Sequence, residues 1–144
     1  MHTAEDVLRT KGRSVWSVRP TDTVLHALGV MAERDVGAVL VLDDDRLVGI
    51  LTERDYARKV VLVGRSSKDS PIRDVMTSHV VCVAPSRSID DCMALMTDKR
   101  VRHLPVINHK RVVGLISIGD LVKATIADHE FTISQLQNYI AGTG

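Results

Sequence analysis

Hydrophobic residues recur at helical spacing in two stretches of the chain, and each stretch follows a residue suited to cap a helix. The first stretch follows Thr23 and the second follows Ser88. Intervals of three, four and seven residues place side chains on one face of a helix, and a hydroxyl side chain commonly caps its first turn. The two stripes are Val24, Ala27, Leu28 and Met31, and Ile89, Cys92, Met93 and Met96. This pattern predicts two amphipathic helices.

Short apolar runs rich in β-branched residues surround each of these helices and are typical of strands. One run precedes each helix and ends before Pro20 or Pro85, and two more follow it, joined by a polar turn. A further helix is predicted to open at Thr52 and another at Ser117, which gives the order β-α-β-β-α twice. The expected strands are Val15–Val18, Ala38–Leu42, Leu47–Leu51, Val80–Val83, His103–Ile107 and Val112–Ile116.

The two halves of the chain form an internal repeat. Residues 16–56 align without a gap on residues 81–121, and nine of these 41 positions are identical. The offset is 65 residues. Further upstream, residues 6–8 align with residues 74–76 at an offset of 68, so the first half carries three extra residues in between. Self-similarity of this length predicts two copies of one structural unit.

A unit of three short strands and two helices buries too little apolar surface to be stable alone. Two copies packed sheet against sheet would share a core, so the predicted fold is a mixed α/β (α+β) module with pseudo-twofold symmetry. We expect a first repeat at residues 1–66 and a second at 67–144, which includes a C-terminal helix from Ile118 to Ile140. Together they would form one compact module with equivalent clefts where the halves meet.

The last expected strand of each half runs into the same polar pattern. A glycine, two apolar residues and a hydroxyl residue are followed, three positions later, by an aspartate. The pattern extends from Gly49 to Asp55 in the first half and from Gly114 to Asp120 in the second. One interpretation is a capping box, in which the hydroxyl and the aspartate satisfy free amides at the start of a helix.

The other interpretation of this pattern is a nucleotide site. Free amides and a hydroxyl at a helix start bind phosphate, and a carboxylate can accept hydrogen bonds from both hydroxyls of a ribose. Thr52 and Ser117 would then help to hold phosphate, while Asp55 and Asp120 would bind the sugar. Because the pattern occurs twice at matched positions, we favour the binding interpretation.

The duplication, the element order, the two polar patterns and the segment Arg102-His103-Leu104-Pro105-Val106 resemble the CBS domain family. Two tandem CBS repeats form a Bateman module. The resemblance implies that the chain binds an adenine nucleotide between its halves, with AMP as the first expectation and ATP, ADP and NAD as alternatives. It also implies that the module regulates another protein and is not itself an enzyme.

Carried over by position, the resemblance implies two clefts, each completed by the first strand of the opposite repeat. The halves also differ at the start of their second strand, with Gly37-Ala38 in one and Arg102-His103 in the other, so we expect unequal clefts. The expected residues are Thr52, Asp55, Val81 and Cys82 in one cleft, and Ser117, Asp120, Trp16 and Ser17 in the other.

Several of these residues have a second interpretation. Trp16 can stack on adenine or fill the core, and Arg102 can bind phosphate or be a solvated surface charge. A basic cluster after Thr52 can border a polyphosphate or form the wet face of a helix, and we favour the wet face. The members of this cluster are Arg54, Arg58, Lys59 and Arg65.

Composition and charge add mainly exclusions. With 19 basic and 18 acidic side chains among 144 residues, the formal net charge of +1 disfavours a dedicated nucleic-acid or membrane-surface binder. No apolar stretch is long enough to span a bilayer and no signal segment is evident, so a cytoplasmic location is expected. Cys82 and Cys92 lack metal or redox spacing, and no phosphate-loop, dinucleotide or nucleophile-elbow motif occurs. We expect no metal site and no catalytic residues.

The sequence therefore predicts a stand-alone ligand sensor that acts in trans on a protein partner of unknown identity. A homodimer is expected from the resemblance. The alternative is a structural interaction module whose clefts stay empty. An enzyme acting on nucleotides is the least supported hypothesis, because no base, nucleophile or metal set is visible in the sequence.

Overall fold

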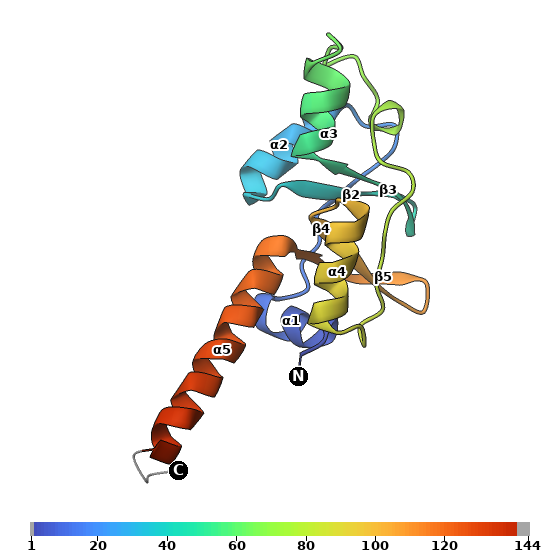
Figure 1. Ribbon diagram of the computed structural model, residues 1–144. Coiled ribbons are helices and arrows are strands. Elements are labelled where there is room, and N and C mark those ends of the chain that lie inside the picture. The colour runs from blue at the N-terminus through green and yellow to red at the C-terminus, as the bar shows by residue number, and fades with distance from the viewer. Residues whose placement is uncertain (1, 141–144) are drawn as a thin grey trace.

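The computed structural model describes residues 2–140, with side chains up to residue 138. Two α/β halves are stacked one above the other, and a long C-terminal helix projects away from the lower half (Figure 1). The elements are α1 (Ala4–Lys11), β1 (Ser17–Val18), α2 (Val24–Arg34), β2 (Ala38–Asp43), β3 (Arg46–Thr52), α3 (Glu53–Tyr56), η1 (Ala57–Val61), η2 (Ile72–Asp74), α4 (Ile89–Lys99), β4 (His103–Asn108), β5 (Arg111–Ser117) and α5 (Ile118–Ile140). The predicted mixed α/β fold of two similar halves is confirmed.

The first half contains a three-stranded sheet in the order β1-β2-β3. β1 pairs in parallel with β2, and β2 pairs antiparallel with β3, with a bulge between Val41 and Leu42. The predicted hairpin is confirmed, and each of its strands is slightly longer than expected. β1 consists of Ser17 and Val18 and is therefore shorter than the predicted strand Val15–Val18.

The strand predicted at Val80–Val83 is wrong. Its only ladder pairing is a single parallel bridge between Val83 and Val106, and the second sheet consists of β4 and β5 alone. In the first half, the backbone N of Leu40 donates to the carbonyl of Trp16 at 3.0 Å. Pro105 occupies the position of Leu40 in the second half. Proline has no N–H to donate, so the corresponding bond cannot form and the pairing stops at Val83.

Both amphipathic helices begin where their caps predicted. The Thr23 hydroxyl accepts a hydrogen bond from the backbone N of His26 at 3.1 Å. The Ser88 hydroxyl accepts one from Asp91 at 3.0 Å. From the stripes, Val24, Ala27 and Met31 are buried in one half, and Ile89, Cys92 and Met96 in the other.

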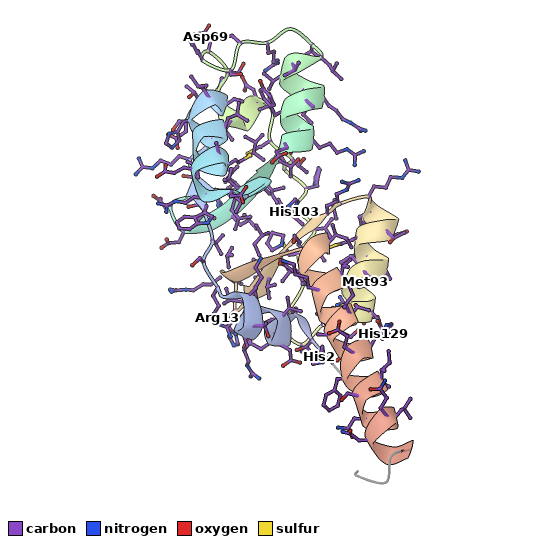
Figure 2. All side chains as sticks on the ribbon, turned by 90° about the vertical axis from the view of Figure 1, so that its left-hand side faces the viewer. His2, Arg13, Asp69, Met93, His103 and His129 are labelled. Carbon is purple, nitrogen blue, oxygen red and sulfur yellow. The ribbon has the colours of Figure 1, made fainter. Side chains whose placement is uncertain are left out.

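The two halves meet through a small shared apolar cluster. Ala38, Leu40 and Ile50 of the first half are buried in it, and partly buried residues of the second half, including Val112 and Leu115, pack against them. The sheets therefore face each other as expected. Figure 2 shows His103 at this junction, between the upper and lower halves.

Each half is covered by a segment that stands directly before the other half in the sequence. α1 precedes the first half and covers the second, and η2 precedes the second half and covers the first. α1 packs on the core of the second half, where Ala4, Val7 and Leu8 are buried. In the same way, Ile72 of η2 and Val75, which follows η2, belong to the core of the first half. The backbone bonds match as well. Ala4 N donates to Arg87 O at 2.8 Å, and its counterpart Ile72 N donates to Asp22 O at 2.8 Å.

Candidate functional site

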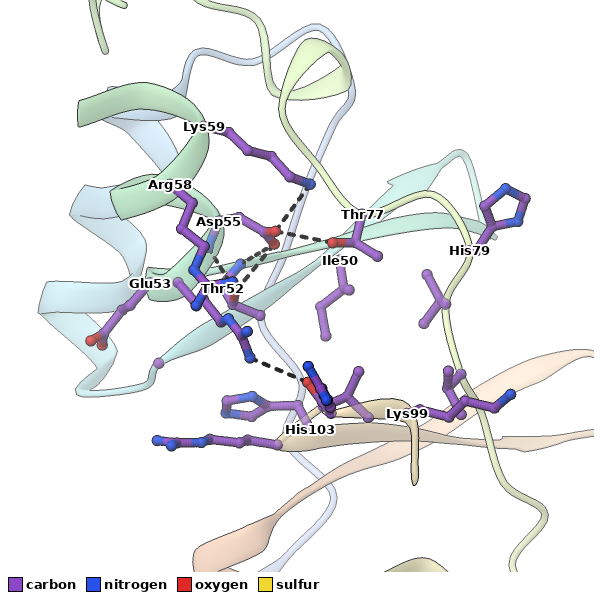
Figure 3. A pocket seen from close by; sticks show the side chains of 17 residues that line it. Ile50, Thr52, Glu53, Asp55, Arg58, Lys59, Thr77, His79, Lys99 and His103 are labelled. Atoms are coloured by element: carbon purple, nitrogen blue, oxygen red, sulfur yellow. Dashed lines mark hydrogen bonds and ion pairs between the residues drawn. The ribbon is translucent and has the colours of Figure 1, made fainter. Parts of the chain in front are cut away.

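An open pocket of about 500 Å³ lies between the two halves, beside the start of α3. The first half supplies the end of β3, α3 and η1, and the second supplies the end of α4 and the start of β4. Figure 3 shows these two walls, with Asp55 and Lys59 on one side and His103 on the other. The lining residues are Gly37, Ile50, Thr52, Glu53, Arg54, Asp55, Arg58, Lys59, Thr77, His79, Val80, Val81, Lys99, Arg100, Val101, Arg102 and His103.

Asp55 is the buried acid of this pocket, with 8% of the residue exposed. Its Oδ2 accepts hydrogen bonds from the backbone N and the hydroxyl of Thr52 at 3.0 and 3.1 Å. Its Oδ1 accepts one from the Thr77 hydroxyl at 3.0 Å and pairs with Lys59 Nζ at 3.1 Å. Asp55 N in turn donates to the Thr52 hydroxyl at 3.1 Å, so the capping box is present. The same carboxylate therefore caps α3 and lines the pocket.

Positive charge dominates the rim of the pocket. Among the described residues that line it, Glu53 and Asp55 are the acids, against six arginine and lysine side chains, all of them exposed. Arg54 donates to the carbonyl of Arg100 at 3.3 Å, which links the two walls. The six cationic residues are Arg54, Arg58, Lys59, Lys99, Arg100 and Arg102. A pocket of this kind favours an anionic ligand.

His103 reaches the pocket from the first residue of β4. Its Nε2 lies 3.8 Å from the position that a Cβ would take on Gly37, so the imidazole borders the backbone of the first half. Burial lowers the pKa of His103, and the charge of Lys11 lowers it further against the opposing effect of Asp120 and Glu53. The imidazole is therefore neutral at pH 7 and offers a hydrogen bond without a positive charge.

Asp120 has different surroundings from those of Asp55. Its Oδ2 accepts hydrogen bonds from Ser117 N at 2.8 Å and from Lys11 Nζ at 2.6 Å. Burial raises the pKa of Asp120, but the bonds from Lys11 and Ser117 outweigh it and hold this pKa below its usual value. Asp120 lines a separate pocket of about 370 Å³, bounded by α1 and α5 rather than by the two halves.

Family comparison agrees with the duplicated structure. The CBS domain model matches the chain twice, at residues 4–62 and at residues 72–127. The chain belongs to the CBS domain family. This CBS pair is 41% identical over 149 residues to the "CBS domain-containing protein CBSX3, mitochondrial" of Arabidopsis thaliana, covering 97% of this chain and 72% of the relative. It is 30% identical over 143 residues to YhcV of Bacillus subtilis, covering 99% of this chain and 92% of that protein.

Solved CBS proteins share the structure of this pair. A protein with CBS domains from Burkholderia ambifaria superposes with a TM-score of 0.86 at 52% identity, over 88% of this chain and 96% of its own. The CBS-domain protein ATU1752 of Agrobacterium tumefaciens gives 0.82 at 38% identity, over 86% and 99%. The CBS pair of protein MJ0100, solved with 5′-methylthioadenosine and S-adenosyl-L-methionine, gives 0.76 at 19% identity and so shares the fold alone.

Six of the residues expected at the clefts of the CBS pair line the pocket between its halves, and a seventh, Asp120, lines the pocket beside α1. Five others line neither of these pockets. Trp16 packs on the first core with the Arg34 guanidinium 4.2 Å from its ring centre, and Ala38 is buried in the shared cluster. Ser17 is exposed, Cys82 is half-buried with its thiol pKa raised by burial, and Ser117 caps α5. The six lining residues are Gly37, Thr52, Asp55, Val81, Arg102 and His103.

Sequence reasoning missed residues that the structure brings to the two aspartates. Thr77 belongs to the segment that precedes the second half, and Lys11 lies at the end of α1. The alignment of residues 6–8 with residues 74–76 was a signal that these segments are part of the repeat. The favoured wet-face interpretation of the basic cluster is also incomplete. Arg54, Arg58 and Lys59 are exposed but line the pocket, and Arg65 instead pairs with Asp74 at 4.0 Å.

Two further observations concern the described part of this CBS pair. Within residues 2–140, no helix has the length and apolar character needed to cross a membrane. Among the same residues, no three histidine, cysteine, aspartate or glutamate side chains gather as metal ligands.

Proposed function

We propose that this CBS pair is a regulatory module that binds an adenine nucleotide in the pocket at Asp55 and catalyses no reaction. The observation that carries the proposal is the composition of that pocket. A buried carboxylate, half-buried apolar residues and six cationic side chains meet between the two halves. These three features suit the ribose, the base and the phosphates of a nucleotide.

The ribose would bind to Asp55 by replacing Lys59. A carboxylate offers about four acceptor positions, and Thr52, Thr77 and Lys59 now use those of Asp55. Lys59 is 44% exposed and pairs with Asp55 across one turn of the chain. Because the ammonium of Lys59 is in contact with solvent, it can leave Asp55 without being buried elsewhere, and a sugar hydroxyl can take its acceptor position.

The phosphates would bind to the cationic rim. Arg58 and Lys59 follow Asp55 in the chain, while Arg100 and Arg102 face them from the second half. Guanidinium groups match the geometry of phosphate oxygens, which favours a nucleotide over a free nucleoside. AMP is the first ligand to test. ADP, ATP and NAD belong in the same titration, because their longer phosphate chains can reach more of the rim.

The base would lie against the apolar part of the lining. Ile50 is buried, and Val80 and Val81 are half-buried beside it. The open backbone at Gly37 and the neutral ring of His103 border the same space. The ligands of the MJ0100 pair share the adenosine part of the proposed ligand but carry no phosphate. Because that pair shares only the fold, the proposal rests on the residues of this chain.

Regulation would be exerted on another molecule. We propose that a nucleotide signal passes to a protein partner in trans. We also propose a homodimer, supported by apolar side chains that α5 leaves exposed, among them Val122, Ile126 and Leu136. The cytoplasm is the proposed location, whereas the Arabidopsis relative is named as mitochondrial.

Calorimetric titration of the purified protein, stripped of carried-over ligand, with AMP, ADP, ATP and NAD tests the proposal. We expect saturable binding of at least one of them. Asp55→Ala should weaken it roughly ten- to hundredfold, because a hydrogen bond to a charged group contributes about 1.5–3 kcal/mol. The matched control is Asp45→Ala, which removes an exposed acid from a hairpin turn.

Two outcomes would contradict the proposal. Equal affinity in folded Asp55→Ala protein would remove Asp55 from the site. No heat and no thermal shift with any of the four nucleotides would instead favour a structural interaction module with empty clefts.

A further inference from the structure

The two aspartates of the repeated pattern are paired with lysines of different origin. Asp55 pairs with Lys59, four residues along its own chain segment. Asp120 pairs with Lys11 of α1, which lies 109 residues away in the sequence. Lys11 Nζ donates to Asp120 Oδ2 at 2.6 Å and to the carbonyl of Leu115 at 2.8 Å. Two acceptors of the second half therefore hold one ammonium group from the first.

The repeat shows what this ammonium replaces. At the offset of 65, Leu115 corresponds to Ile50. The carbonyl of Ile50 accepts a hydrogen bond from the backbone N of Thr77 at 2.9 Å, since the chain there runs beside β3 as a bridge. In the second half, the carbonyl at this position is satisfied by the side chain of Lys11 instead.

Lys11 can reach the carbonyl of Leu115 because α1 is longer than η2, the helix that covers the first half. η2 ends at Asp74, whereas α1 continues past the matching residue to Lys11 and stops at Gly12, which has a φ of 101°. The chain after α1 is then fixed, because Arg13 donates to both carboxylate oxygens of Glu5 at 2.8 and 2.5 Å. At the offset of 68, the counterpart of Lys11 is His79, which is exposed and lines the open pocket.

We propose that Lys11 occupies the sugar-binding position at Asp120, so that the module holds one nucleotide per chain, at Asp55. This inference rests on the proposed function, because it assumes that the aspartate of the pattern binds ribose. A neutral hydroxyl forms a weaker bond to a carboxylate than an ammonium does. A nucleotide at Asp120 would also leave the carbonyl of Leu115 without its donor, whereas displacing Lys59 from Asp55 breaks a single ion pair.

The test is the number of nucleotides bound per chain, measured by equilibrium dialysis with the nucleotide that binds best in the titration. Lys11→Met keeps the apolar stem of the side chain and removes the ammonium, and Lys11→Gln is a second variant that can still donate to the carbonyl of Leu115. The matched control is Lys123→Met, since Lys123 is an exposed lysine that lines the same pocket as Lys11. Circular dichroism establishes that each variant is folded.

We expect one nucleotide per chain in the wild type and in Lys123→Met, and two in both Lys11 variants. In the double variant Lys11→Met/Asp55→Ala, one nucleotide should bind at Asp120, and the second, at the weakened Asp55 site, should bind only at roughly ten- to hundredfold higher nucleotide concentration. Two nucleotides in the wild type, or one in both folded Lys11 variants, would overturn this inference and leave the proposed function standing. No binding in the wild type or in either Lys11 variant would overturn the proposed function, and the inference with it.

Discussion

His103 lies at the junction of the halves, where groups of opposite charge surround it. Lys11 and Arg102 disfavour its protonation, while Asp120 and Glu53 favour it, and burial makes the neutral form prevail. Its pKa in the folded protein is therefore below the ordinary value of 6.5. Below that pH the unfolded chain takes up a proton that the folded chain resists, so protonation favours unfolding.

We expect the free energy of unfolding to fall as the pH drops from 7.5 to 5.5, and to fall less in His103→Gln. The contribution of His103 is complete above its ordinary pKa and is lost as the pH decreases toward the folded pKa. Urea denaturation at a series of pH values measures this dependence. His129→Gln, at an exposed position near the middle of α5 (Figure 2), is the control and should match the wild type. An unchanged slope in His103→Gln would show that another group titrates in this range.

The residue scale also shows what the sequence could and could not predict about the site. The repeated pattern pointed to Thr52 and Asp55, and both line the pocket, since the cap and the pocket depend on the same local geometry. It could not distinguish Asp55 from Asp120. That difference depends on Lys11, whose position is set by a helix end more than a hundred residues away from Asp120.

At the scale of elements, the docking of α1 on β5 depends on Gly114. A Cβ added there would lie 2.5 Å from Cδ2 and 2.7 Å from Cδ1 of Leu8, which is fully buried. Gly49 plays the same part in the first half, where the side chain of Met76 approaches it. Each covering segment therefore packs against a glycine of the strand that it crosses.

Gly114→Ala should destabilise the protein by about 1–3 kcal/mol, the usual cost of overpacking a core. Thermal denaturation measures the effect. Gly29→Ala is the matched control, because Gly29 is exposed within α2 and a Cβ there meets nothing within 4 Å. Alanine is the better helix former by up to about 1 kcal/mol, so this control should raise Tm. A Gly114→Ala protein as stable as the wild type would mean that α1 can shift at no cost.

Elements were predicted well wherever local chemistry determines them. Caps at Thr23 and Ser88 and the apolar stripes fixed the two amphipathic helices, and turn residues fixed both hairpins. The strand at Val80–Val83 failed because pairing is a property of two segments, and its partner carries Pro105 at the position where an N–H is needed. The lengths of α1 and η2 likewise depend on the half against which each of them packs.

At the scale of the whole molecule, each core draws on two separate parts of the chain. The core of the first half takes Ile72 and Val75 from beyond residue 66, and α1 serves the second half. A fragment of residues 1–66 would therefore contain α1 without the second half on which it packs, and the core of the first half without Ile72 and Val75, which cover it. A fragment of residues 13–78 has the same length and retains the cover.

We expect the 13–78 fragment to show more helical circular dichroism and a more cooperative thermal transition than the 1–66 fragment. Burying Ile72 and Val75 contributes about 1.5–3 kcal/mol for each side chain, which is large for a unit of this size. Equal melting of the two fragments, or a more stable 1–66 fragment, would show that η2 is dispensable to the first core.

The exchange of covering segments also sets an order of events during synthesis. α1 leaves the ribosome before the other elements of the CBS pair, and the strand and helix on which it packs, β5 and α5, are made about a hundred residues later. At roughly 5–20 residues per second, the nascent helix waits for several seconds with an apolar face uncovered. The first half can be covered by η2 soon after its own sheet emerges. Within the CBS pair, α1 is thus the first element to be made and among the last to pack against the rest of the structure.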